Sequence, residues 1–432
     1  MPGAGPHFRA GIVPAQAVPP AMDVRRMPIA SSEFPHSQEE RAMTQDALSQ
    51  NVTLYRGLMD VYIDRTEISM IDATGGRLIL RGYPFEDLVA KSTFEETTFL
   101  LINGYLPDAG ELSKFIEDMR FCRSLPEPII DIIARIKHAH PMDVLRTVVS
   151  ALAAFDPETS DNSIPAIKRK STRLLSQSAV AVATHHALRS GRDPVAPDDN
   201  LDHAANFLLM LTGTAPTEVE ARVLNEDFIL HAEHGSNASS FTGRVIASGL
   251  SSYHAAVAGA VASFEGPLHG GAINGVAQMV EEIGSPDRVE AYVMERRRKR
   301  ERIMGFGHRV YKTADPRARV LRKHVELLSG QKGKHVYLEI LERIRDEMKG
   351  YARHGVNIND DFYGSVSYKL LGIEDDLCAA VFSLCRMVGW TAQIIEQVEN
   401  NILIRPLLHY TGKERQYAPL HERPTRQMKE AV

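Results

Sequence analysis

The stretch 265–271, Glu-Gly-Pro-Leu-His-Gly-Gly, presents a single histidine among residues that break helices. It follows an alanine-rich apolar run, and the glycines and proline around His269 interrupt any helix formed by that run. The imidazole is therefore displayed at a break in the chain. Such a histidine is a candidate for contact with a ligand, although the pattern alone also fits an ordinary surface residue.

A second pair of histidines lies at the end of another apolar segment. His231 and His234 are three residues apart, a spacing that places both imidazoles on one side of a helix, where they could face one cavity. A zinc protease requires His-Glu-x-x-His instead, and no cysteine or further histidine spacing supports a metal. We therefore predict no metal site.

Two more stretches carry groups that could act on a substrate. In 305–312, Gly-Phe-Gly-His-Arg-Val-Tyr-Lys, flexible glycines expose His308, and Arg309 and Lys312 make the loop a plausible cradle for a diphosphate. In 357–364, Asn-Ile-Asn-Asp-Asp-Phe-Tyr-Gly, two adjacent aspartates stand beside aromatic residues. A carboxylate that is partly removed from water becomes a better base. Each stretch alone also fits a capping or surface role.

Most of the chain predicts helices that would position these groups. Ser92–Glu95 reads as a capping box and Gly104 as the stop of the same helix, while Pro141 suits a first helical turn. Helical periodicity recurs over 174–188, 203–212, 218–233, 238–264, 273–283, 286–302, 316–329, 335–350 and 376–398. Two β-prone runs, 61–63 and 77–80, flank Gly75-Gly76 and predict a small hairpin. The fold class is therefore mainly α.

Composition excludes several kinds of partner. Lys and Arg number 50 against 55 Asp and Glu, so the net charge of −5 gives no basic excess for nucleic acid or an anionic membrane. The basic run 295–302 contains interleaved glutamates and reads as a solvated helix end. No uninterrupted apolar run reaches the ~18 residues of a membrane span, and no secretion signal is recognised. We expect a soluble, cytoplasmic protein.

The three cysteines form no Cys-x-x-Cys pair, which fits a reducing compartment. Cys378 and Cys385 are seven residues apart, on one helical face, and are expected in the core. Residues 1–48 are rich in proline, alanine and glycine and are expected to form a disordered or extended tail.

Together these motifs make the chain resemble the citrate synthase family from about residue 54 to residue 424. The matching segments, in chain order, are Arg81-Gly-Tyr83, 92–96, 140–143, His231-Ala-Glu-His234, 266–271, 305–312, Asp315-Pro-Arg317, 359–363, Arg386, Gly389-Trp390, Glu396-Gln397 and 402–406. Several independent motifs in one order make a chance similarity negligible.

The resemblance implies a Claisen-type condensation. In the family the methyl carbon of acetyl-CoA is deprotonated, the enol attacks the keto carbon of oxaloacetate, and the thioester is then hydrolysed to citrate and CoA. The resemblance implies that Asp361 is the base, that His269 hydrogen-bonds the thioester oxygen, and that His308 polarises the ketone. Donors opposite a base suit this reaction because negative charge moves from carbon onto oxygen.

The resemblance also implies how the substrates are held. Guanidinium groups bind carboxylates in bidentate fashion, and oxaloacetate has two carboxylates. The positions that match the family's oxaloacetate-binding residues are His234, Arg317, Arg386 and Arg405. Arg405 matches an arginine that reaches across from the other subunit, which implies a homodimer and leaves open a higher oligomer. Arg309 and Lys312 match the region around the CoA phosphates, and acyl-CoA is a co-substrate rather than a permanently bound cofactor.

The implied architecture is a large helical domain, a smaller helical domain and a minor N-terminal hairpin. The large domain would comprise 49–274 and 373–432, and the small domain 275–372. Closure of the small domain over the substrates would exclude water until condensation is complete.

The chain departs from the family pattern near the implied site. Asp360 stands where the family usually has an apolar residue, and Gly364-Ser365 reverses the usual order. Ile273 separates the usual Ala-Asn pair, and Ser236 precedes Asn237 where leucine is more usual. The acyl group therefore stays open between acetyl and a propionyl or longer chain, as in a 2-methylcitrate or alkylcitrate synthase. A citryl-CoA-cleaving enzyme would need an ATP-using module that this chain lacks, and a non-catalytic binder would be free to lose the base.

Overall fold

The computed structural model describes residues 52–58, 60–413 and 415–423. Contacts between residues divide the chain into two units, of which the larger comprises Ile63–Pro406. The described part of the other unit lies within 52–62 and 407–423 and contains two short 3₁₀ helices, η2 (Arg56–Leu58) and η7 (Leu420–Glu422). The predicted tail, 1–48, lies outside the described residues.

The larger unit begins with a small antiparallel sheet. Strands β1 (Ser69–Asp72), β2 (Arg77–Leu80) and β3 (Tyr83–Pro84) pair in the order β1-β2-β3, with Ser69 opposite Leu80. The Asp72 carboxylate accepts hydrogen bonds from the backbone of Thr74 and Gly75, which closes the β1–β2 turn. The hairpin is confirmed, but the expected strand 61–63 is wrong. That segment lacks the half-buried alternation that a strand in this sheet needs, since Tyr62 is almost wholly exposed.

The remaining described elements of this unit are helical, which confirms the mainly α fold. The helices that precede His269 are α2 (Phe85–Lys91), α3 (Phe94–Asn103), α4 (Ala109–Phe121), α5 (Glu127–Arg135), α6 (Pro141–Leu152), α7 (Ile164–Arg189), α8 (His203–Thr212), α9 (Glu218–His231), α10 (Ala238–Ser248) and α11 (Tyr253–Phe264). The helices that follow His269 are η3 (Gly270–Ile273), α12 (Asn274–Ile283), η4 (Pro286–Arg288), α13 (Val289–Arg298), α14 (Ala318–Lys332), α15 (His335–Met348), η5 (Lys349–His354), α16 (Asp361–Leu370), η6 (Asp375–Leu377) and the long α17 (Cys378–Glu399).

Two helix boundaries differ from the sequence expectation for local reasons. The expected single helix 238–264 is wrong, because Leu250 adopts a positive φ of 61° and Ser252 caps a new helix. The expected capping box at Ser92 is also shifted by one residue. Thr93 is the N-cap and accepts from the Glu96 backbone, whereas the buried Glu95 accepts from the His203 backbone.

Helix α17 is the centre of the core. It packs against α3, α6, α7, α9, α10 and α11, and Cys378 and Cys385 are buried in it as free thiols. Among the described residues, Asp375–Glu399 is the segment long and apolar enough to cross a membrane by length and composition. Its apolar window lies wholly inside the protein, as expected for a core helix.

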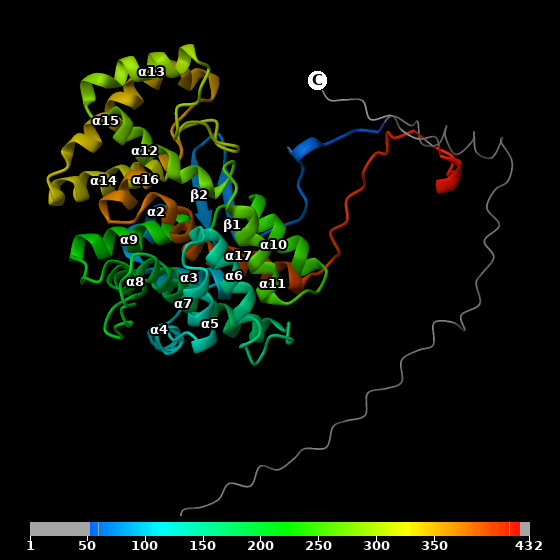
Figure 1. Ribbon diagram of the computed structural model, residues 1–432. Coiled ribbons are helices and arrows are strands. Elements are labelled where there is room, and N and C mark those ends of the chain that lie inside the picture. The colour runs from blue at the N-terminus through cyan, green and yellow to red at the C-terminus, as the bar shows by residue number, and fades with distance from the viewer. Residues whose placement is uncertain (1–51, 59, 414, 424–432) are drawn as a thin grey trace, which may run out of the picture. The chain divides into compact units, whose positions relative to one another are not determined.

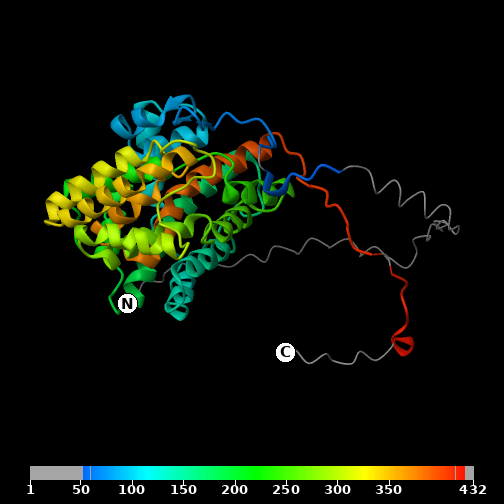
Figure 2. The ribbon, with the colours of Figure 1, turned by 90° about the horizontal axis from the view of Figure 1, so that it is seen from above.

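Helices α12–α16 form a second group within the same unit (Figures 1 and 2). Helix α14 packs against α15 and α16, α12 packs against α16, and α13 packs against α15. Ion pairs of Arg296 with Glu282 and of Lys299 with Glu295 hold the charged end of α13, in agreement with a solvated helix end. This group spans 274–370 and so begins one residue before the predicted small domain, 275–372, and the division into a large and a small domain stays a prediction.

Candidate functional site

The histidine and carboxylate stretches converge where α9 and α17 meet the loops before α14 and α16. Backbone hydrogen bonds join these two loops: Gly307 N–H donates to the Asn357 carbonyl (2.7 Å), and Asn359 N–H donates to the Gly305 carbonyl (3.0 Å). Gly305 has a φ of 81°, and a Cβ there would lie 2.9 Å from the Cα of Phe362. Only glycine therefore allows the loops to approach this closely.

His308 is held in a defined tautomer. Its Nδ1 accepts hydrogen bonds from the backbone N–H groups of Val310 (3.0 Å) and Tyr311 (2.9 Å). Burial, and then the Arg317 charge, lowers the pKa of the imidazole, which favours the neutral form. The proton of the neutral ring must then be on Nε2, so this nitrogen can donate to a ligand oxygen.

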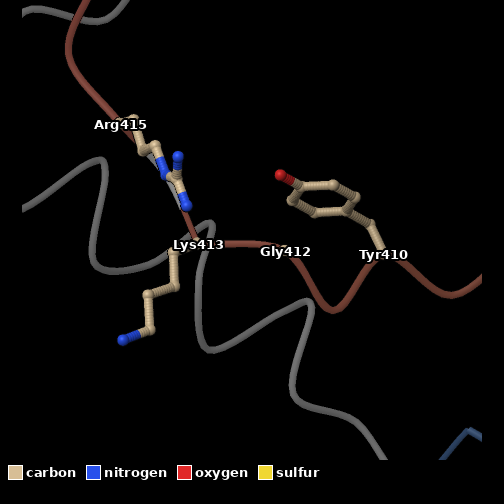
Figure 3. A pocket seen from close by; sticks show the side chains of 4 residues that line it. All are labelled: Tyr410, Gly412, Lys413 and Arg415. Atoms are coloured by element: carbon tan, nitrogen blue, oxygen red, sulfur yellow. The ribbon is translucent and has the colours of Figure 1, made fainter. Parts of the chain in front are cut away.

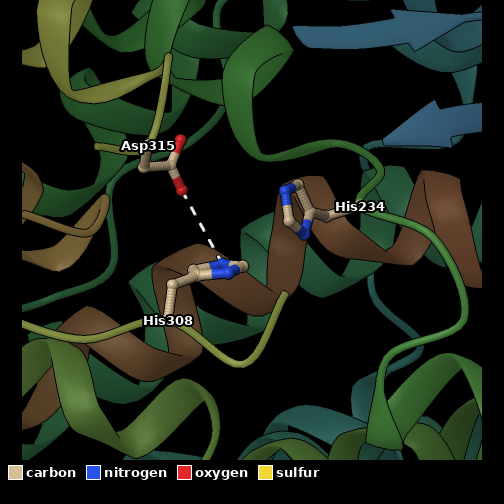
Figure 4. Close-up of side chains that lie close together, drawn as sticks. All are labelled: His234, His308 and Asp315. Atoms are coloured by element: carbon tan, nitrogen blue, oxygen red, sulfur yellow. Dashed lines mark ion pairs between the residues drawn. The ribbon is translucent and has the colours of Figure 1, made fainter. Parts of the chain in front are cut away.

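His234 and Asp315 lie beside His308, and the three side chains face one another (Figure 4). The two imidazole rings are edge to face with centroids 5.4 Å apart, and His308 Nε2 is 3.8 Å from Asp315 Oδ2. Burial, together with the charge of Arg317, lowers the pKa of His234 well below its usual value. This trio has the spacing of metal ligands. The Asp315 carboxylate, however, already accepts hydrogen bonds from a guanidinium. A metal ion bound at this trio would lie close to that positive charge and be repelled by it.

That guanidinium belongs to Arg317, whose side chain is 2% exposed. Its Nε and Nη2 donate to Asp315 Oδ1 (3.0 Å) and Oδ2 (2.7 Å) in a bidentate pair. Its Nη1 lies 2.9 Å from Asp360 Oδ2, but the angles do not make a hydrogen bond, and Nη1 is buried without a hydrogen-bond partner. One donor of this arginine is therefore available to a ligand.

Arg386 brings a second buried cation from α17. Its Nε donates to the His231 carbonyl at the end of α9 (2.6 Å), and its guanidinium carbon lies 5.0 Å from the Phe382 ring centroid. The hydrogen bond and the ring fix the position of the guanidinium. Arg317 and Arg386 are thus both placed to meet an anionic ligand.

His269 is oriented from behind by α10 and α17. The Ser239 backbone N–H donates to its Nε2 (3.3 Å), and Ser239 Oγ lies 2.9 Å from the same nitrogen. Trp390 Nε1 donates to that Oγ (3.0 Å). Burial, and then Arg386, lowers the pKa of His269 to about 4. A neutral ring that accepts at Nε2 carries its proton on Nδ1, so Nδ1 is a donor.

Two adjacent carboxyl groups complete the arrangement, and their pKa values move in opposite directions. Burial opposes ionisation of Asp360, but the neighbouring Arg317 and His231 override it and hold the pKa of this carboxyl below its usual value. Burial, and then the Asp360 charge, raises the pKa of Asp361 well above its usual value. Asp360 is therefore the resident anion and Asp361 the stronger base.

Three predicted site residues lie apart from this cluster. Arg405 is exposed and makes no hydrogen bond or ion pair with the described residues. Arg309 and Lys312 are exposed on the loop that carries His308, and the Lys312 backbone bonds Ala73 and Asn357. All three side chains are exposed, unlike the buried His231 and His234.

Two hollows are described, one in each unit. One, of about 350 Å³, lies in the larger unit between the β1–β2 turn at Gly75-Gly76 and the segment 313–319, and Arg322, Ile358 and Tyr363 also border it. The other, of about 610 Å³, is bordered by Tyr410, Gly412, Lys413 and Arg415 (Figure 3). These four residues belong to one exposed stretch, so this hollow is an open surface of the chain.

Comparison with known proteins identifies the family. The family model described as "Citrate synthase, C-terminal domain" matches residues 57–407. The chain is 39% identical over 374 residues to citrate synthase from Deinococcus radiodurans, covering 85% of this chain and 98% of that protein. The chain belongs to the citrate synthase family.

The relatives of this chain have names that give two different activities. The chain is also 39% identical over 375 residues to 2-methylcitrate synthase 2 from Corynebacterium glutamicum, covering 85% of this chain and 97% of that protein. A solved citrate synthase from Thermoplasma acidophilum, in a ternary complex with carboxymethyl coenzyme A and oxaloacetate, superimposes with a TM-score of 0.82. That structure is 31% identical and covers 86% of this chain and all of its own.

The residues that hold the side chains of the site in place were not predicted from the sequence. Asp315 is the bidentate partner of Arg317, and the two-residue spacing was a signal for it. Asp227 lies 3.2 Å from His231 Nδ1, at the i, i+4 spacing of one helix face. Asp360 does not point to solvent, as an extra charged residue beside the base could, because its side chain is only 13% exposed between a guanidinium and an imidazole.

Proposed function

We propose that this enzyme condenses acetyl-CoA with oxaloacetate and hydrolyses the resulting thioester to citrate and CoA. The observation that carries the proposal is the pair of neutral donors, His269 Nδ1–H and His308 Nε2–H, in one site with two buried guanidiniums and a raised-pKa carboxyl. A carbon acid needs such a base together with donors for the oxygens that become negative.

In the proposed mechanism, ionised Asp361 takes a proton from the methyl carbon of the acyl group. The electron pair of the broken C–H bond forms a C=C bond, and the π pair of the C=O bond moves onto the thioester oxygen, which accepts a hydrogen bond from His269. The resulting enol forms a C–C bond to the keto carbon of oxaloacetate, while the π pair of the ketone moves onto its oxygen, which accepts the Nε2 proton of His308. Water then cleaves the C–S bond, which gives citrate and CoA.

Substrate binding is proposed from the charges of the site. The free Nη1 donor of Arg317 and the guanidinium of Arg386 suit the two carboxylates of oxaloacetate, and His234 lies beside them. Arg309 and Lys312, exposed on the same loop as His308, are placed to meet the phosphates of CoA. No metal or permanently bound cofactor takes part in these steps.

A second candidate substrate is propionyl-CoA, because 2-methylcitrate synthases are as similar to this chain as citrate synthases are. One methylene changes discrimination by only about 1–3 kcal/mol, so few substitutions are needed to change the preference. Release of CoA from acetyl-, propionyl- and hexanoyl-CoA with oxaloacetate, followed with a thiol reagent, separates the candidates. We expect acetyl-CoA to have the highest kcat/KM, and a tenfold advantage of propionyl-CoA would assign the second function.

The proposed active unit is a homodimer in which Arg405 completes the partner's site. Arg405 contacts none of the buried site residues of its own chain, and the preceding Ile402 and Leu403 are 69% and 61% exposed. Apolar side chains left this open suit burial against another copy. The proposed setting is the tricarboxylic acid cycle in the cytoplasm, which is consistent with free cysteines.

Mixing two impaired variants, at an oxaloacetate concentration too low for Arg405→Ala alone, tests the shared site. An Asp361→Ala subunit lacks its own base but supplies Arg405, whereas an Arg405→Ala subunit keeps the base and lacks the arginine. In a mixed dimer the Arg405→Ala subunit therefore regains a complete site. We expect activity to return on mixing after subunit exchange, and Arg405→Ala alone to raise the KM for oxaloacetate far more than that for acetyl-CoA. No recovery in verified mixed dimers would contradict the shared site.

A further inference from the structure

Asp360 stands against a cation that the substrate also needs. Arg317 has three nitrogens, and Asp315 takes the hydrogen bonds of Nε and Nη2. The third, Nη1, lies 2.9 Å from Asp360 Oδ2 in an ion pair without hydrogen-bond geometry. Nη1 is therefore the nitrogen of Arg317 without a hydrogen-bond partner, and a substrate carboxylate that takes it competes with the Asp360 carboxylate that already faces it.

Asp360 also has a second partner on the opposite side. The same Oδ2 lies 3.6 Å from Nε2 of His231, and Nδ1 of that ring lies 3.2 Å from Asp227. Asp227 is fixed in turn by the Tyr368 hydroxyl, which donates to it at 2.7 Å. His231 is thus a buried imidazole held between two carboxylates, and neither ring nitrogen has a hydrogen-bond partner. An imidazole with an unused donor can take Asp360 when Arg317 is occupied.

We propose that Asp360 is a specificity-determining residue that competes with a substrate carboxylate for Nη1 of Arg317, and that His231 receives Asp360 when the substrate binds. The inference rests on the proposed binding of oxaloacetate at Arg317. The consequence of this competition is a weaker affinity for oxaloacetate, because part of the binding free energy displaces the resident carboxylate.

Replacing Asp360 tests the competition. Asp360→Asn removes the charge and keeps the shape, and Asp360→Val removes both the charge and the hydrogen-bonding atoms. We expect both variants to lower the KM for oxaloacetate by about tenfold, the factor that applies if Nη1 is free of Asp360 in about a tenth of the unliganded molecules. An unchanged or higher KM in both variants would overturn the proposal.

Asp315→Asn is the matched control on the same guanidinium. Asp315 orients Arg317 through two hydrogen bonds and leaves Nη1 free, so its loss should raise the KM for oxaloacetate. Competition requires that the KM for oxaloacetate falls in the Asp360 variants and rises in Asp315→Asn. If removing any negative charge helped binding, the KM would fall in all of these variants, and if both aspartates were purely structural, it would rise in all of them. Either result would contradict the proposal.

The measurements are chosen so that the two hypotheses fail separately. Steady-state kinetics at saturating acetyl-CoA give the KM, and calorimetric titration of each folded protein with oxaloacetate gives the dissociation constant without turnover. If the native enzyme binds oxaloacetate but releases no CoA, the proposed function fails. The titrations then still compare the dissociation constant for oxaloacetate of the native enzyme with that of Asp360→Asn. If the native enzyme turns over and both Asp360 variants bind oxaloacetate no more tightly, only the competition fails.

Discussion

The two walls of the site are held in different ways. The helical wall comprises Arg386 and His269. Arg386 donates to a main-chain carbonyl, and His269 accepts from the Ser239 backbone, whose hydroxyl accepts in turn from Trp390. On the loop wall, the backbone segments 305–307 and 357–359 are joined by hydrogen bonds, but the side chains hold one another mainly by charge. Packing sets the geometry of the first wall, whereas electrostatics sets that of the second.

The difference assigns distinct tasks to the walls. Neutral polar groups locked by packing keep their direction while a substrate enters, which suits a hydrogen-bond donor such as His269. Charged groups that share partners can exchange them, which suits the binding of an anion and the tuning of a base. Substitutions on the loop wall should therefore have larger and more pH-sensitive effects than those on the helical wall.

Removal of the base on the loop wall should give the largest effect. We expect Asp361→Ala to lower kcat by about 10²–10⁴-fold, the usual contribution of a positioned acid or base. Asp360→Ala should lower kcat far less, because that carboxyl is held as an anion and has the weaker basicity of the two. Single-turnover formation of citrate measures both, and the reverse pattern would show that Asp360 is the base.

The close approach of the two loops gives the next largest effect. A Cβ at residue 305 would meet the backbone and ring of Phe362 at 2.7–2.9 Å, so Gly305→Ala must shift the loop that carries His308. We expect roughly a 10²-fold loss in kcat, since a displacement of the order of 1 Å costs that much. Gly307→Ala is the matched control, because its φ of 92° is also left-handed but the added Cβ meets open space.

Gly307→Ala should be destabilised by only about 1–2 kcal/mol, the cost of a left-handed non-glycine residue. Thermal unfolding and kcat, measured on both variants, separate strain from displacement. Equal losses of kcat in the two variants would show that the approach of the loop to Phe362 is not what positions His308.

On the helical wall the effect should be smaller. Ser239→Ala removes the hydroxyl that lies between Trp390 and His269 but keeps the backbone N–H that donates to His269 Nε2. We expect about a tenfold loss in kcat with little change in the KM for oxaloacetate, because one of two orienting contacts remains. Ser171→Ala is a control for the loss of a buried hydroxyl, because the Ser171 hydroxyl donates to the Lys168 carbonyl of its own helix, away from His269. A 10³-fold loss in Ser239→Ala would mean that the helical wall is as sensitive as the loop wall.

The same contrast explains what the sequence could predict. Periodicity and turn residues foretold the helical class and most helix positions, because those signals are local. The break after α10 was missed although Gly249 is its C-cap, because the positive φ falls on Leu250 and not on the glycine. The motifs located His269, His308 and Arg317, since glycine and arginine patterns are visible in the chain.

The partners across the site could not be read from the sequence. The contact between His231 and Asp360 joins residues 129 apart, and it depends on how α9 packs beside the loop before α16. The opposite pKa directions of Asp360 and Asp361 follow from that packing, because the cations that hold down the pKa of Asp360, Arg317 and His231, are distant from it in sequence. Adjacent aspartates look equivalent in the chain, and only the fold distinguishes them.

The smallest expected effect is a shift in pH dependence. Asp361 must be ionised to accept a proton, so kcat/KM for acetyl-CoA should rise with pH through its raised pKa. Burial raises this pKa first, the charges of Asp360 and Asp315 raise it further, and Arg317 lowers it. Asp360→Asn removes one raising charge and leaves burial, so the acidic limb should move to lower pH without reaching the usual range of aspartate. The profiles are compared at saturating oxaloacetate, with Asp346→Asn, a surface carboxylate paired with Lys349, as the control. A limb that stays in place in Asp360→Asn would mean that the pKa of Asp361 is set by burial alone.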